Sequence, residues 1–124
     1  MQVIGKRVWV IAEGYIPPHG TGHEPEFTSH ETACMLNCSD EDAQVEVMLY
    51  YGDKEPVGPY RMTVPARRTL HMRFNDLTDP APVPLGVDYA SVIRSSVPIV
   101  VQHTRLDSRQ AENTIMTTIA YSAD

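Results

Sequence analysis

The residues best suited to bind a ligand near the carboxyl end follow directly on an apolar run, SVPIVV at residues 96–101. Successive side chains of a strand point to opposite faces, so a strand here places His103 and Arg105 on the face of Ile99 and Val101. If these apolar residues face the core, the imidazole and the guanidinium line a cleft at the end of the strand. A bend would instead leave both side chains solvated. This alternative has support because charged residues are seldom buried without a reason.

Two other predicted strands also carry ionisable residues on apolar faces. Glu13 ends the apolar run RVWVIAE, and in the run 27–37 one face carries His30 while the other carries Glu31. Polar groups that converge at one end of an apolar cavity are typical of small-molecule sites. We therefore expect a binding site for a small polar ligand. The residues expected to form it are Glu13, His30, Glu31, His103 and Arg105.

Motifs for catalysis and metal binding are weak in this sequence. The histidines and carboxylates above are metal ligands by type, but no HxH, HExxH or CxxC spacing occurs, and we predict neither a metal nor a cofactor. Ser29 is only adjacent to His30, and adjacent strand residues face opposite ways. The chain also lacks GxSxG, Walker and GxGxxG motifs. We therefore predict a binding protein without catalytic residues rather than an enzyme.

Charge is distributed unevenly along the chain. The net charge is −6; residues 1–52 hold eight acids and two bases, whereas residues 54–73 hold five bases and one acid. DNA binding needs surplus Lys and Arg to neutralise phosphates, so a DNA-binding regulator is disfavoured and would depend on the basic stripe at 54–73. The residues expected at a subunit contact or an anion site are Arg67, Arg68, Asp107 and Arg109.

The elements that must position these residues are strands. Apolar and polar residues alternate most clearly in RTLHMRFND, and Pro, Gly, Asn and Asp clusters separate the runs. The predicted strands are 7–13, 27–37, 45–51, 60–64, 68–76, 89–95, 98–104 and 114–121. Segment 106–113 is the only candidate helical turn. About eight short strands predict an all-β, single-domain antiparallel β-sandwich, jelly-roll-like in its connections, over residues 1–124.

Several long segments resemble one known family. They are WVIAEGYIPP (9–18), FTSHET (27–32), YYGDKEPVGPYRMTVPARRT (50–69), RFNDLTDPAPVP (73–84), DYASVI (88–93) and SVPIVVQHTRLDSRQAENT (96–114). Together they are similar to the Anabaena sensory rhodopsin transducer family, from about residue 4 to residue 122. The polar positions that match the family are Glu13, His30, Glu31, Arg67, Asn75, Asp76, His103, Arg105, Asp107 and Arg109. The resemblance gives none of them a settled catalytic role.

The resemblance implies a small soluble β-sandwich that assembles as a homotetramer. It implies as partner the cytoplasmic face of a microbial sensory rhodopsin, a seven-helix retinal photoreceptor. Cytoplasmic loops of membrane proteins are rich in Lys and Arg, so the acidic residues Asp40, Glu41 and Asp42 are a reasonable docking element, with a solvated turn as the alternative. For the wider family it implies binding of small molecules, carbohydrates included. No apolar run approaches the roughly 20 residues of a membrane span, and we expect a cytoplasmic protein.

Overall fold

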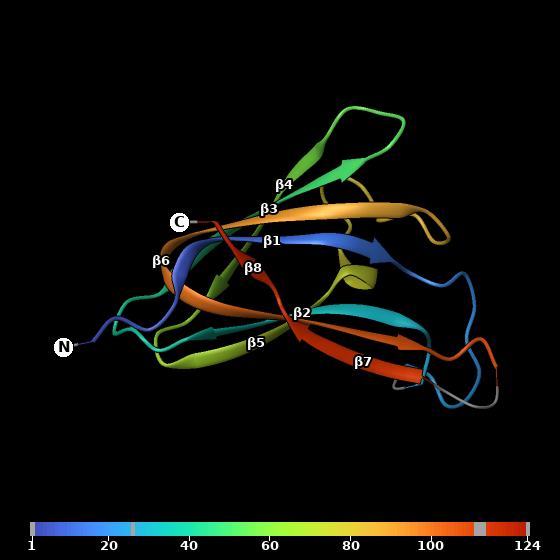
Figure 1. Cartoon of the computed structure of the whole chain (residues 1–124), viewed down its shortest axis with the longest axis horizontal. Helices are drawn as coiled ribbons and strands as arrows, with labels where there is room; N and C mark the ends of the chain where they lie inside the picture. Colours follow the sequence, from blue (N-terminus) through green and yellow to red (C-terminus); the bar gives the residue numbers. More distant parts are fainter. Residues whose placement is uncertain (1, 26, 111–113, 124) are drawn as a thin grey trace.

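The computed structural model describes residues 2–25, 27–110 and 114–123, and it consists almost wholly of antiparallel strands (Figure 1). The strands are β1 (Lys6–Tyr15), β2 (His30–Asn37), β3 (Ala43–Tyr51), β4 (Val57–Val64), β5 (Arg68–Arg73), β6 (Asp88–Asp107), β7 (Thr114–Ile119) and β8 (Tyr121–Ser122). A short 3-10 turn, η1 (Phe74–Asp76), follows β5. The predicted all-β sandwich is confirmed. Among the described residues, no helix is long and apolar enough to cross a membrane.

The 20-residue strand β6 belongs to both layers of the sandwich. Its first half pairs with β1 and β3, in a layer ordered β4-β3-β6-β1-β8. Its second half pairs with β2 and β7, and β5 pairs with β2 to complete the other layer. In Figure 1 the layer with β2, β5 and β7 lies below the layer with β1, β3 and β4.

The sequence divides these strands differently from the structure. The predicted strands 89–95 and 98–104 are one strand, although the second was predicted to begin at Pro98. A proline has no N–H for a ladder, but Pro98 lies between Arg94 and Ile99, where the pairing of β6 with β1 has a register shift, and the pairing with β2 begins at Val100. The predicted strand 114–121 is two strands, because β7 pairs with β6 in one layer and β8 pairs with β1 in the other.

Two further predictions need correction. The strand predicted at 27–37 begins only at His30, because the Phe27 and Thr28 amides bond back to the preceding loop. The helical turn predicted at 106–113 does not form in its described part: β6 continues to Asp107 and residues 108–110 are not helical. Residues 111–113 lie outside the described part of the chain.

The core lies between the two layers. It is formed by the apolar residues that alternate with polar residues along the strands. Ile99 and Val101 are fully buried, as are Met35 of β2 and Ile93 in the first half of β6. Each such side chain contributes about 1.5–3 kcal/mol when it is removed from water. The predicted inward face of β6 is therefore correct, and it continues without a break to His103, which is 5% exposed.

Candidate functional site

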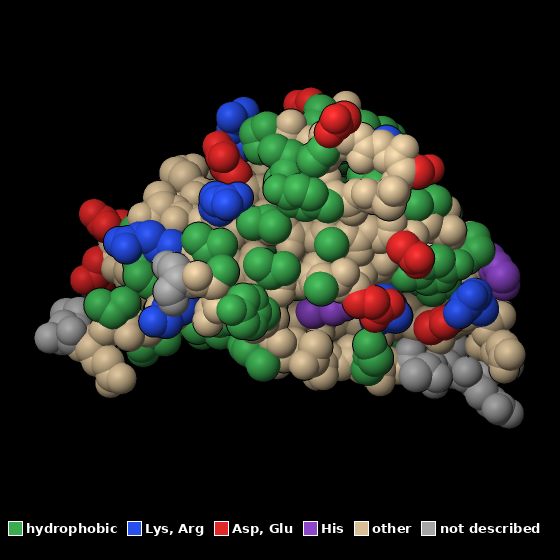
Figure 2. Space-filling view, turned by 45° about the horizontal axis from the view of Figure 1, so that its top comes forward, with side chains coloured by type: hydrophobic (Ala, Val, Ile, Leu, Met, Phe, Trp, Pro, Cys, Tyr) green, Lys and Arg blue, Asp and Glu red, His purple; other side chains and the backbone are tan. Residues whose placement is uncertain are grey.

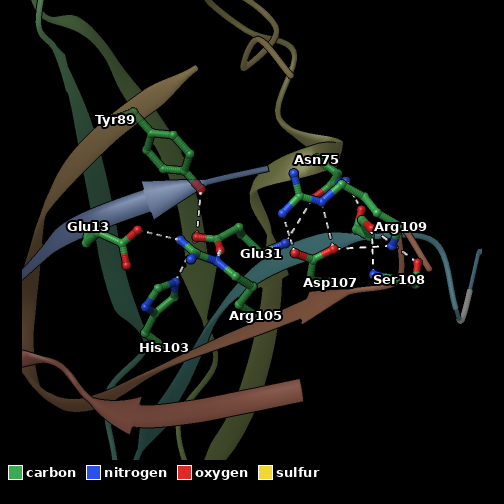
Figure 3. A network of polar contacts seen from close by, with 10 residues as sticks. Glu13, Glu31, Asn75, Tyr89, His103, Arg105, Asp107, Ser108 and Arg109 are labelled. Carbon is green, nitrogen blue, oxygen red and sulfur yellow. Dashed lines mark hydrogen bonds and ion pairs between the residues drawn. The ribbon is translucent and has the colours of Figure 1, made fainter. Parts of the chain in front are cut away.

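The carboxylate of Glu31 is fully buried at the start of β2 and lies at the centre of a polar cluster (Figure 3). Its Oε1 accepts hydrogen bonds from His103 Nε2 at 2.8 Å and from the Tyr89 hydroxyl at 3.3 Å. Its Oε2 accepts a hydrogen bond from Arg105 Nε. An ionised carboxylate without partners would be costly to bury, and these three donors from β6 offset that cost.

Arg105 joins the buried carboxylate to the surface. Its Nη2 donates to Glu13 Oε2 at 3.1 Å. The Glu13 side chain is 71% exposed. The pairing of β1 with β6 has a register shift between Ile11 and Gly14, the stretch that contains Glu13. Burial alone would lower the pKa of Arg105, but the hydrogen bond and charge of Glu31 outweigh it and raise the pKa. The guanidinium therefore stays charged between two carboxylates.

Tyr89 is the member of this cluster that sequence reasoning did not select. Burial raises the pKa of Tyr89, and the neighbouring Glu31 charge raises it further, so the phenol stays protonated and donates its hydrogen. Its ring packs against Phe74, with centroids 5.3 Å apart. The signal was present, because alternation along DYASVI places Tyr89 on the same face as Ile93.

Polar side chains around the start of β2 hold Glu31 in place. The Asn75 Oδ1 accepts the Glu31 amide at 3.2 Å, while its Nδ2 donates to the Ser29 carbonyl at 3.1 Å. The Ser29 and Ser108 hydroxyl oxygens lie 3.1 Å apart, and the Ser108 amide donates to Ser29 Oγ at 2.9 Å. These bonds tie the loop before β2 to the end of β6, which fixes the distance between Glu31 and its partners.

The structure brings together four of the five residues predicted to bind a ligand. Glu13, Glu31, His103 and Arg105 form one connected cluster. His30 lies outside it, because residues 30 and 31 point to opposite faces and Glu31 takes the inward one. The His30 Nδ1 bonds the Thr28 carbonyl at 2.7 Å.

The other predicted residues fall into two separate places. Asp107 and Arg109 form an ion pair within one chain, with 2.6 Å between Oδ2 and Nη2. The hydrogen bond from Arg109 lowers the pKa of Asp107 below its ordinary value. Arg67 lies in the turn between β4 and β5, and Arg68 is the first residue of β5.

The charged groups of the cluster around Glu31 find their hydrogen-bond partners within the cluster. Both carboxylate oxygens have donors, and the guanidinium of Arg105 is shared by two acids. Neither of the two cavities described below is lined by these residues. Within the described ranges, no group of three His, Cys, Asp or Glu side chains is arranged to hold a metal ion. The geometry therefore suits a stabilising ion network better than an open ligand site.

A cavity of about 460 Å³ lies at the opposite end of β1 and β2, and we name it the amino-terminal cavity. Its lining residues are Gln2, Val3, Ile4, Arg7, Cys38, Ser39, Asp40, Glu41, Arg67, Val97 and Pro98. A Cβ at Gly5 would lie 2.2 Å from the Ile99 carbonyl oxygen, so glycine lets the amino-terminal segment cross β6 closely and form one wall. A second cavity of about 270 Å³ lies on β3 and β4.

Fold and cluster together define a small β-sandwich with a buried ion network at one end of β1 and β2 and an open cavity at the other. The sequence pattern of the Anabaena sensory rhodopsin transducer family matches residues 4–122, and the chain belongs to this family.

Fourteen solved chains are similar to it, two of which are as follows. One, described as the Anabaena sensory rhodopsin transducer, is 72% identical with a TM-score of 0.78, and the match covers 89% of this chain and 96% of that one. The other, a crystal structure of Thermotoga maritima 1070, is 32% identical with a TM-score of 0.87, covering 98% and 97%. A comparison with curated proteins finds no match.

Proposed function

We propose that this protein is a non-enzymatic signal transducer that binds the cytoplasmic face of a sensory rhodopsin. The observation that carries the proposal is the 72% identity to the Anabaena sensory rhodopsin transducer over 89% of this chain. Assembly as a homotetramer in the cytoplasm is part of the proposal.

A transducer of this kind acts through differential affinity. Binding shifts a receptor between two states only if the protein binds one of them more tightly. We place the docking element at the loop with Asp40, Glu41 and Asp42. Asp40 pairs with Arg67, and Asp42 Oδ1 accepts the Ala66 amide at 2.9 Å, so the loop is held in one shape before it meets a partner.

The test is a binding titration against a sensory rhodopsin in lipid nanodiscs, in the dark and under illumination. The triple variant Asp40→Asn, Glu41→Gln, Asp42→Asn is expected to weaken binding at least tenfold. The control removes three exposed acids elsewhere, through Asp53→Asn, Glu55→Gln and Asp79→Asn, and is expected to bind as the unmodified protein does. Equal affinity in dark and light would overturn the proposal, and unchanged binding of the triple variant would overturn the docking element.

A second candidate function is a small-molecule sensor, and the amino-terminal cavity favours it. Ligand pockets commonly enclose about 300–1,000 Å³, and this cavity, at about 460 Å³, falls in that range. The site predicted from the sequence around Glu31 stays a separate prediction. A DNA-binding role has less support, because a net charge of −6 opposes contact with phosphates.

A further inference from the structure

The amino-terminal cavity joins an apolar floor to a rim that carries both signs of charge. Val3, Ile4, Val97 and Pro98 supply apolar surface, and Val3 and Ile4 remain 69% and 52% exposed. Figure 2 shows Lys and Arg side chains beside Asp and Glu side chains at the end of the molecule that carries the amino terminus in Figure 1. An apolar body placed here would cover surface that the fold leaves open to water.

We propose that this cavity binds a small zwitterion with an apolar body, which is the chemistry of an apolar α-amino acid. The inference rests on the second candidate function and names its ligand class. In the bound state, the ligand carboxylate receives N–H donors from Arg67, while its ammonium donates to the carboxylates of Asp40 and Glu41. The apolar side chain lies on Val97 and Pro98.

The backbone at Arg67 supports this role. Among the described residues it is the one residue other than glycine with a positive φ, at 58°. A residue with a Cβ is strained in this region, where glycine and asparagine are favoured, and such strain gathers at ligand sites. Two contacts hold the turn in this shape: the Arg67 amide donates to the Ser39 carbonyl at 3.1 Å, and Asp42 accepts the Ala66 amide.

The rim charges favour a zwitterion over a ligand with a single charge. Arg67 donates from Nε and Nη2 to Asp40 Oδ1, at 2.7 and 2.6 Å, which leaves further guanidinium hydrogens available at the surface. A purely anionic ligand would meet Asp40 and Glu41, and a purely cationic ligand would meet Arg67. Like charges brought together oppose binding, so a ligand with both charges suits this rim best.

Cys38 provides a local reporter because it lines the cavity and is exposed. In a Cys34→Ala background it is the single thiol of the chain. The rate at which iodoacetamide alkylates Cys38 is measured alone and with L-phenylalanine, 3-phenylpropionate or 2-phenylethylamine. These three probes share one phenyl body and differ in charge. L-phenylalanine at ten times its Kd is expected to slow alkylation about tenfold, and the two singly charged probes far less.

Arg67→Gly is the decisive variant, because glycine accepts the positive φ and the fold is retained. Protection by L-phenylalanine is expected to disappear in Arg67→Gly and to persist in Arg68→Gly, which removes a neighbouring guanidinium that does not line the cavity. Thermal unfolding of both variants checks that each is folded. Full protection in Arg67→Gly would overturn the inference.

The probes also separate the possible failures. Equal protection by 3-phenylpropionate and L-phenylalanine would overturn the zwitterion while leaving a small-molecule site. Absence of protection by all three would overturn the inference and remove the cavity as the sensor site, whereas receptor binding is tested independently. Protection by the dipeptide Phe-Gly equal to that by L-phenylalanine would identify a peptide amino terminus, rather than a free amino acid, as the source of the ammonium.

Discussion

Both ends of strands β1 and β2 carry an arginine paired with a carboxylate, but the central carboxylate is buried at one end and the pair is exposed to water at the other. Glu31 and Cys38, which mark these ends, are seven residues apart in the chain, about 23 Å along an extended strand. At the first end a buried carboxylate is enclosed by His103, Tyr89 and Arg105. At the second, Arg67 and Asp40 are 72% and 65% exposed beside an open cavity. The central charge at the first end is buried and paired, whereas the paired charges at the second end are open to water beside a cavity.

The largest effect is expected from Arg105→Met at the buried end. The variant leaves the Glu31 carboxylate without its guanidinium partner, and breaking a buried ion pair by removing one member costs about 3–5 kcal/mol. Urea denaturation measures the loss in the free energy of unfolding.

Combining Arg105→Met with Glu31→Leu provides the control, since the buried charge is then gone as well. The double variant is expected to recover much of the stability that the single variant loses. A loss below about 1 kcal/mol in Arg105→Met would show that the Glu31 cluster is not a stabilising network.

Alternation in the sequence was enough to predict that the chain forms strands, though not all of their bounds, and the inward face of β6. It placed His103 and Arg105 on the face of Val101, and that placement is correct because side-chain direction depends only on local backbone geometry. It left open whether His30 or Glu31 faces inward, since both faces of that strand carry apolar residues.

Partners from distant segments were beyond the reach of the sequence pattern. The contact between Tyr89 and Glu31 joins residues 58 positions apart, and no local periodicity encodes it. The amino-terminal cavity depends on the positive φ of Arg67 and on the path of residues 2–4 across β6, and both are set by tertiary packing. The ion-pairing of Arg105 was hidden for the same reason.

The second-largest effect is expected from Tyr89→Phe, which removes one donor to the buried carboxylate. A hydrogen bond to a charged group contributes about 1.5–3 kcal/mol, and the ring still packs against Phe74. The matched control is Tyr60→Phe, whose hydroxyl donates to the neutral Ala81 carbonyl, and it is expected to lose about 0.5–1.5 kcal/mol. If both variants lose the same amount in urea denaturation, the Glu31 charge adds nothing to the Tyr89 bond.

A smaller effect of opposite sign is expected at the exposed end. Arg67→Gly loses an exposed ion pair with Asp40, contributing about 0–1 kcal/mol, but it relieves the left-handed backbone, which costs about 1–3 kcal/mol. The difference of these two ranges is a net gain of about 0–3 kcal/mol, seen as a higher Tm. Arg68→Gly, in a strand, is expected to lose about 0.5–1 kcal/mol. A Tm that falls in Arg67→Gly would show that its backbone is not strained.

The smallest effect is expected from the ion pair of Asp107 and Arg109, which tests whether burial or position in the fold sets the strength of a pair. Asp107 and Arg109 lie at the same end as Glu31, yet their side chains are 28% and 41% exposed. Hydrogen bonding from Arg109 lowers the pKa of Asp107 in the folded state below the ordinary value of 3.8, so the stability that this carboxylate contributes is complete above that value. It is lost as the pH falls through the lowered pKa.

A double-mutant cycle of Asp107→Asn and Arg109→Gln measures this coupling from thermal unfolding at pH 6 and pH 2.5. Exposed ion pairs contribute little to stability, so a small coupling is expected at pH 6, with a smaller value still at pH 2.5. A coupling at pH 6 as large as that between Arg105 and Glu31 would mean that position at this end, rather than burial, sets the strength of an ion pair. A small coupling would instead make burial the property that distinguishes the two ends of the sandwich.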